Sequence, residues 1–114
     1  MSKRAPLLLL EDMVLASQKI TAYTNDQTFE SFAGNAMVVD AVVRNFEILG
    51  EAASKMPHAF TAVNPQIPWR QIKDYRNRLI HEYFGTDPHL LWALRSREIP
   101  RLTDLLEFLI AQPD

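Results

Sequence analysis

The chain has 114 residues, which is room for one domain with one hydrophobic core and not for two. Apolar residues make up 47 % of it, and proline and glycine together only 10 residues, which argues against a disordered or collagen-like chain. Cysteine is absent, which excludes disulfides, thiolate metal sites and cysteine nucleophiles. The net charge of −2, from 12 basic and 14 acidic residues, argues against a polybasic, nonspecific nucleic-acid binder. We therefore expect a single domain over residues 1–114.

The N-terminus superficially suggests a signal peptide, because Lys3 and Arg4 precede four consecutive leucines at positions 7–10. Glu11 and Asp12 break this apolar run at once, and no small-residue cleavage site follows. The run is too short for a signal sequence or a membrane span. We expect these residues to open a core helix of a soluble, cytoplasmic protein that does not contact a membrane.

The first predicted helix covers residues 6–23. Its apolar side chains recur mostly at three- and four-residue steps, as in an amphipathic helix: Leu7, Leu10, Val14, Ala16, Ile20 and Tyr23. Pro6 suits the first helical turn. The helix should end in the polar stretch 24–28, where Asp26 or Thr28 is expected to cap the next helix.

The second predicted helix, over residues 28–56, is the longest. One apolar seam steps by 4, 3, 4, 3, 4 and 3 residues, as in a helical bundle: Phe32, Ala36, Val39, Val43, Phe46, Gly50 and Ala53. Other apolar residues cover much of the remaining surface, and a single polar line stays: Asp40, Arg44, Glu47 and Glu51. A helix that is apolar over most of its circumference must be buried on several sides, so we expect a homodimer in which a second copy covers it.

The rest of the chain predicts further helices. Residues 57–68 contain three prolines and should form a loop with a short turn around residues 58–63. A helix should follow from Pro68 to about Leu79 or beyond, and the last should begin near Asp87, with a kink allowed at Pro100. No alternating strand pattern occurs. The prediction is an all-α, up-and-down bundle of four main helices plus a short extra helix.

A dense polar cluster lies at residues 73–83. On a regular helix at about 100° per residue, Asn77 and His81 are one turn apart, whereas Arg76 lies five residues before His81 and about 140° round. Arg76 and His81 therefore cannot share a face of a regular helix. They would meet across a helix end, or across a two-fold axis with the other subunit's copy.

These residue types suit one kind of chemistry. A histidine can take or give a proton near neutral pH, and an arginine can hold a phosphate and stabilise charge that gathers on its oxygens. Such groups can cleave RNA without a metal, because the 2′-hydroxyl attacks its own phosphodiester; DNA lacks that hydroxyl. The alternative is an ordinary solvated surface, in which Glu82 pairs with Arg78.

Residues 76–83 (RNRLIHEY) match R-x4-H-x-Y, the signature of the HEPN superfamily as carried by HepT-like ribonuclease toxins. Residues 44–53 (RNFEILGEAA) resemble the second-helix motif of that family. Trp69, the pair Leu91–Trp92 and residues 99–102 are similar to the family too. The resemblance covers nearly the whole chain, in order and at family-like spacing.

The resemblance implies a helical homodimer whose two signatures face each other across a cleft and form a metal-independent endoribonuclease. Arg76 and His81 would be the catalytic pair, supported by Asn77, Arg78 and Tyr83, with no cofactor. The family toxin is encoded beside a small nucleotidyltransferase antitoxin (MNT) in a type VII toxin–antitoxin system. This antitoxin would transfer AMP to the motif tyrosine, here Tyr83, which fills the cleft and repels RNA.

The chain departs from the family pattern just before the arginine, where a small residue and an apolar one are usual and Asp74 and Tyr75 stand instead. If Asp74 points into the cleft it would repel phosphate, whereas Tyr75 would either stack on a base or pack. A second hypothesis is therefore a non-catalytic HEPN bundle that binds a nucleotidyltransferase partner or a nucleotide. A third is a structural dimer with an incidental polar cluster.

The polar line on the second helix has two interpretations as well. Arg44, Glu47 and Glu51 are candidates to line the cleft and hold Arg76 or Arg78 in place; otherwise they form a solvated or ion-paired stripe. No metal is expected there, because the Glu-x-x-His repeat of di-iron bundles is missing. Trp69 and Trp92 are expected to anchor the core or an interface rather than stack on bases.

Overall fold

The computed structural model describes residues 4–81 and 87–112. Its elements are α1 (Arg4–Thr24), α2 (Phe29–Ala33), α3 (Ala36–Lys55), α4 (His58–Ala62), α5 (Trp69–His81), α6 (Pro88–Arg97) and α7 (Ile99–Ala111). Within these two ranges no residue lies in a strand, which confirms the expected all-α class. The main segments are α1, α3, α5 and the α6–α7 pair, whereas α2 and α4 have five residues each.

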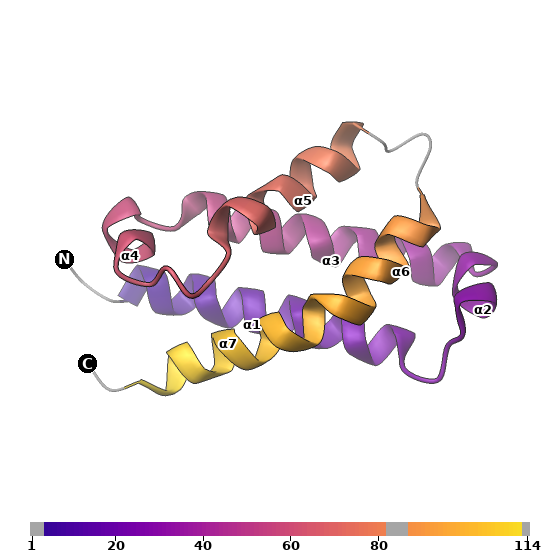
Figure 1. The fold of residues 1–114 in the computed structure, drawn as a ribbon, viewed down its shortest axis with the longest axis horizontal. Helices are drawn as coiled ribbons and strands as arrows, with labels where there is room; N and C mark the ends of the chain where they lie inside the picture. Colours follow the sequence, from indigo (N-terminus) through magenta and orange to yellow (C-terminus); the bar gives the residue numbers. More distant parts are fainter. Residues whose placement is uncertain (1–3, 82–86, 113–114) are drawn as a thin grey trace.

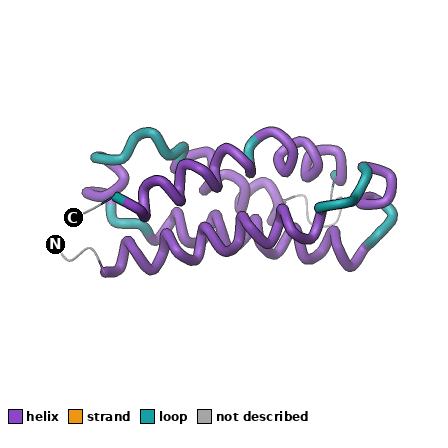
Figure 2. The backbone as a smooth tube through the Cα atoms, turned by 90° about the horizontal axis from the view of Figure 1, so that it is seen from below, coloured by secondary structure: helices purple, strands orange, loops and turns teal. Residues whose placement is uncertain are grey.

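The long helices run up and down along one axis (Figures 1 and 2). α1 lies beside α3, α7 packs against α1, and α5 packs against α3 from the outside (Figure 1). The core lies where α3 and α7 pack against α1 and where α5 packs against α3, and its members without solvent exposure include Met13, Ile20, Phe46, Leu49 and Leu106. α5 is thus an outer helix, with one side packed on the bundle and the other directed away from it.

The first predicted helix is confirmed, because α1 matches residues 6–23 to within two residues at either end. Thr28 caps the following helix as expected: its side chain accepts a hydrogen bond from the Ser31 backbone N–H at 3.1 Å. Asp26 lies in the preceding turn instead, with a φ of 59°. None of the described helices is long and apolar enough to cross a lipid bilayer.

The prediction of a single helix over residues 28–56 is wrong, because the structure divides this segment into α2 and α3. The break falls at Gly34 and Asn35. Glycine disfavours a helix interior, and the Asn35 side chain accepts a hydrogen bond from the Val38 N–H at 3.2 Å, which begins α3. The periodic pattern of apolar residues continues across this break, and so conceals it.

The last predicted helix is also divided, which extends the kink expected at Pro100 into a full break. α6 ends at Arg97, and Pro100 lies in the first turn of α7. A proline has no backbone N–H to continue the helix but is well tolerated in a first turn. The Glu98 N–H closes α6 on the Leu94 carbonyl oxygen at 2.9 Å.

α3 is covered on several sides, as its composition predicts, but the cover comes from its own chain. α1, α5, α2 and α6 all contact it. Val42, Phe46, Leu49 and Ala53 have no exposed surface. The apolar circumference of α3 therefore does not require a second copy, and the homodimer stays a prediction with other support.

Candidate functional site

The outer helix α5 begins after a loop that its own first residue holds in place. The Trp69 indole Nε1 donates a hydrogen bond to the Asn64 carbonyl oxygen at 2.9 Å, and the Trp69 ring packs edge-on against Phe60. Ile72, Tyr75 and Leu79 then form the buried face of α5. The expected role of Trp69 as a core anchor is confirmed.

The polar face of α5 carries the described part of the signature. Its exposed residues are Arg70, Gln71, Lys73, Asp74, Arg76, Asn77 and Arg78. α5 ends at His81, of which only the helical backbone is described, and Tyr83 lies outside the described residues. The structure therefore places Arg76, Asn77 and Arg78 on one exposed helix, directly before position 81.

Gly50 of α3 leaves the space that Arg76 of α5 needs to pack closely against α3. A Cβ atom at position 50 would lie 2.6 Å from the Arg76 Cβ, and 3.2 Å from both the Arg76 backbone N and the Ile72 carbonyl oxygen. These separations are shorter than van der Waals contact, so only glycine allows α5 to approach α3 this closely. Sequence reasoning placed Gly50 in the apolar seam and in a family motif, but missed its role in positioning Arg76.

The backbone of α5 is helical without a break from residue 69 to 81. At about 100° per residue, positions 76 and 81 then point about 140° apart around the helix axis. At position 76 the Cβ lies close against Gly50 of α3. One copy of α5 cannot present both positions to the same face.

Tyr75 packs into the protein and does not offer its ring to a base. It is 3 % exposed, its ring meets Phe46 edge-on, and its hydroxyl donates to Glu98 Oε2 at 2.6 Å. Gln71 donates to the other oxygen of Glu98. Burial raises the pKa of the Tyr75 phenol well above its ordinary value, and the hydrogen bond and charge of Glu98 raise it further. This pair connects α5 to the junction of α6 and α7.

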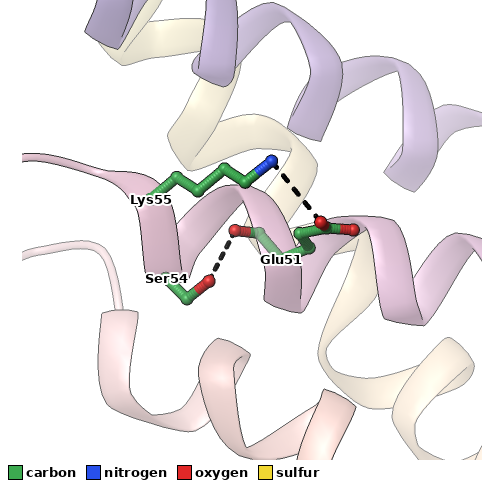
Figure 3. Close-up of polar contacts among 3 residues, drawn as sticks. All are labelled: Glu51, Ser54 and Lys55. Atoms are coloured by element: carbon green, nitrogen blue, oxygen red, sulfur yellow. Dashed lines mark hydrogen bonds and ion pairs between the residues drawn. The ribbon is translucent and has the colours of Figure 1, made fainter.

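The polar line on α3 is partly ion-paired within its own helix. The Glu51 carboxylate forms an ion pair with Lys55, with 3.4 Å between Oε1 and Nζ. The Ser54 hydroxyl donates a hydrogen bond to the Glu51 carbonyl oxygen (Figure 3). Arg44 is exposed and Glu47 is half-buried. Between the side chains that the structure describes, no ion pair joins this line to α5. Glu51 is thus ion-paired along its own helix, and a cleft-lining role stays a prediction for Arg44, Glu47 and Glu51.

An open groove of about 1100 Å³ runs between α4, the loop that follows it, and α5. We call it the α5 groove; its polar α5 residues are Arg70, Gln71, Lys73, Asp74 and Asn77, and His58 and Thr61 line it from α4. Arg70, Asp74 and Asn77 step by four and three residues, and position 81 follows after four more. The groove therefore leads along one stripe of α5 towards position 81, and Asp74 lies in it.

Trp92 is an anchor as expected, at the contact of α6 with α2. Its ring meets Phe32 at 5.2 Å between centroids, and the Arg95 guanidinium lies 4.5 Å from the Trp92 centroid. His89, which we assign no role, stacks on Phe29. Among the described residues, no three His, Asp or Glu side chains gather closely enough to hold a metal ion.

The fold and the polar face of α5 define a helical-bundle protein with a partly basic site on its outer helix. The family model described as "Ribonuclease HepT-like" matches residues 13–109. The chain belongs to this HepT-like ribonuclease family, as its resemblance predicted. No solved structure gives a significant match.

Proteins similar to this chain come from archaea and bacteria. The "Probable ribonuclease HepT" of Thermococcus cleftensis is 38 % identical over 105 residues, which are 92 % of this chain and 96 % of that protein. A protein of Methanocaldococcus jannaschii, named as an inferred RNase, is 35 % identical over 94 % of this chain and 98 % of its own length. One of Caldanaerobacter subterraneus, named likewise, is 32 % identical over 87 % of this chain and 88 % of its own length.

Proposed function

We propose that this protein is a metal-independent endoribonuclease toxin that acts as a homodimer in the cytoplasm. Arg76 and His81 form its catalytic pair, and Asn77, Arg78 and Tyr83 support them. Family membership and the ribonuclease names of its relatives support RNA as the substrate. The observation that carries the proposal is the close packing of Arg76 against Gly50. Arg76 lies there in an unbroken helix that continues to position 81.

The homodimer follows from the geometry of α5. Positions 76 and 81 point about 140° apart, so one phosphate is most simply reached by Arg76 of one copy and His81 of the other. The exposed polar face of α5 is available for such pairing across a two-fold axis. The site is then incomplete in a single chain.

The reaction uses the RNA's own hydroxyl. The 2′-oxygen attacks phosphorus as its proton leaves to a base, and the 5′-oxygen departs and takes a proton. The products are a 2′,3′-cyclic phosphate and a 5′-hydroxyl. His81 moves a proton, while the Arg76 fork binds the non-bridging oxygens, on which negative charge increases in the transition state. No step requires a metal or a cofactor.

The test is cleavage of RNA in EDTA by protein free of any modification at Tyr83. We expect the unaltered protein to leave 2′,3′-cyclic ends, and Arg76→Ala and His81→Ala to lose at least 100-fold in rate while keeping the helical circular dichroism. Arg97→Ala, which removes an exposed arginine from α6, is the matched control and should cleave normally. Equal cleavage by the His81→Ala variant would disprove the assignment.

Neutralisation by an MNT-type nucleotidyltransferase antitoxin completes the proposal. The Tyr83 phenol oxygen attacks the α-phosphorus of ATP, which releases pyrophosphate and leaves AMP on the tyrosine. The added negative charge next to the signature then repels the RNA backbone. Mass spectrometry should find AMP on the unaltered protein and on the control Tyr23→Phe, which removes an exposed tyrosine from α1, but not on Tyr83→Phe.

The rival function is a non-catalytic module that binds a nucleotidyltransferase or a nucleotide. The position of Asp74 in the α5 groove favours it, because a carboxylate there opposes phosphate. This module would bind its partner equally well with His81→Ala and would cleave no RNA in either form.

A further inference from the structure

We propose that the α5 groove holds the RNA backbone beside the scissile phosphate, with Arg70 and Lys73 as its phosphate ligands. This inference rests on the proposed ribonuclease function and extends it from the reacting phosphate to the neighbouring nucleotides. It assigns a binding role to a part of α5 that lies outside the R-x4-H-x-Y signature.

The groove runs along α5 from the signature towards the N-terminal end of the helix. Asn77, which belongs to the signature, lines one part of the groove, and Arg70 lines another. At 1.5 Å per residue, Arg70 lies about 10 Å before Asn77 along the helix axis, and Lys73 about 6 Å before it. A strand that leaves the signature along this face would therefore pass both cations.

Two cationic side chains of α5 line the groove. Arg70 and Lys73 are both exposed, and no ion pair among the described side chains engages either of them. An arginine fork and an ammonium in this state can bind phosphate oxygens without first breaking a contact. The chain as a whole has a net charge of −2, so this positive lining is local and not a general property of the surface.

Hydrogen bonds hold the wall of the groove that lies opposite α5 in place. Asn64 joins this wall to α5, because its carbonyl oxygen accepts from Trp69 and its side-chain amide donates to the Phe60 carbonyl oxygen at 2.9 Å. Ile67 is 1 % exposed beneath the loop. A wall held in this way loses little conformational freedom when a ligand binds.

Asp74 opposes phosphate within the same groove. It lies between Arg70 and Asn77 on the stripe, and no described cation pairs with it. Its carboxylate weakens the hold on the backbone, which favours release of cleaved RNA over tight binding. Opposite changes in affinity are therefore expected from removing the cations and from removing this anion.

The test measures binding of a 2′-O-methyl RNA strand, which lacks the attacking hydroxyl and cannot be cleaved. The variant Arg70→Gln/Lys73→Gln should bind about 10- to 30-fold more weakly at 0.1 M salt, and the slope of log affinity against log salt should fall by about 1.4. Asp74→Asn should bind up to about 5-fold more tightly. The matched control Lys19→Gln/Arg101→Gln removes two exposed charges from α1 and α7 and should bind as the unaltered protein does.

The outcomes separate this inference from the proposed function. If the groove variant binds like the matched control, the groove inference is overturned, whether or not RNA is cleaved. If the groove variant binds the 2′-O-methyl strand more weakly than the matched control but the unaltered protein cleaves no ordinary RNA, the groove stands and the catalytic proposal fails. If the groove variant keeps its RNA affinity but no longer binds a nucleotidyltransferase partner, the groove is a protein-docking surface and the inference is wrong.

Discussion

Gly50 on α3 and Arg76 on α5 lie so close together that any side chain at position 50 would collide with Arg76. A methyl group at position 50 would come within 2.6 Å of the Arg76 Cβ. Close contact at this point holds the arginine at a defined height along α3 and leaves its side chain exposed. The proposed catalytic arginine is thus positioned by a residue that carries no functional group.

Gly50→Ala should destabilise the protein and displace Arg76. Alanine is favoured over glycine inside a helix by about 0.5 to 1 kcal/mol, but overpacking against a neighbouring backbone costs about 1 to 3 kcal/mol. We expect a net loss of about 1 to 2 kcal/mol in the free energy of unfolding, measured in urea, together with slower RNA cleavage.

Gly34→Ala is the matched control for that substitution. A Cβ at position 34 would meet nothing closer than 3.4 Å, and its φ of −86° suits any residue. Its unfolding free energy should stay within about 0.5 kcal/mol of the unaltered value. If the two glycine variants were equally stable and equally active, close packing at Gly50 would not position Arg76.

Tyr75→Phe should cost about 1 to 2 kcal/mol, because the hydroxyl donates to a carboxylate at a nearly buried position. The loss should also depend on pH. The folded protein holds the Tyr75 proton at a raised pKa, whereas the unfolded chain releases it with a pKa of about 10. Stability due to this group is therefore complete below about pH 9 and declines as the pH rises further.

The measurement is the difference in unfolding free energy between the unaltered protein and Tyr75→Phe, taken from pH 7 to 11. The titration of lysines and of other tyrosines cancels in this difference. It should be constant up to about pH 9 and then shrink by at most about 1.4 kcal/mol per pH unit. A difference that stays constant to pH 11 would contradict a raised pKa at Tyr75.

The sequence predicted α1 well, because one amphipathic period spans that helix and a polar stretch follows it. The fold was not predictable at Gly34 and Asn35, because the apolar period runs on through a break that a cap at Asn35 creates. It was not predictable either that α3 is covered by its own chain. That outcome depends on how α1, α2, α5 and α6 are placed in space, and a one-dimensional pattern does not contain that information.

Arg95 is a second place where the chain joins residues that are far apart in sequence. It donates from Nε to Thr24 Oγ1 at 2.7 Å and from Nη2 to the Thr24 carbonyl oxygen at 3.1 Å, and it lies over Trp92. It therefore satisfies the end of α1 from α6. Arg95→Ala should lower the unfolding free energy by about 2 kcal/mol, and Arg95→Lys by less.

The control for that prediction is Arg97→Ala, on the same helix. Arg97 is exposed and makes no hydrogen bond to another described residue, so its loss should change stability by less than about 0.5 kcal/mol. Equal effects of the two substitutions would indicate that general charge, and not the contact with Thr24, accounts for the result at Arg95.

The candidate site was only partly predictable. The signature residues are predicted from their spacing, and the structure shows that Arg76, Asn77 and Arg78 are each exposed on α5. Two features could not be predicted: the close packing of Arg76 on Gly50, and the hydrogen bond from the buried Tyr75 to Glu98, which settles the choice between stacking and packing for Tyr75. Both depend on contacts between segments more than 20 residues apart, for which a single sequence gives no spacing rule.

An obligatory two-fold site predicts complementation between inactive protomers. A heterodimer of Arg76→Ala with His81→Ala, purified through two different tags, keeps one intact pair across the axis and should recover about half the activity of the unaltered dimer. Each variant alone should be inactive. The reciprocal heterodimer pairs an unaltered protomer with the double variant Arg76→Ala/His81→Ala, and it should be inactive because both shared sites lose one member. If instead this second heterodimer cleaves RNA and the first does not, Arg76 and His81 act within one chain, despite lying about 140° apart on α5.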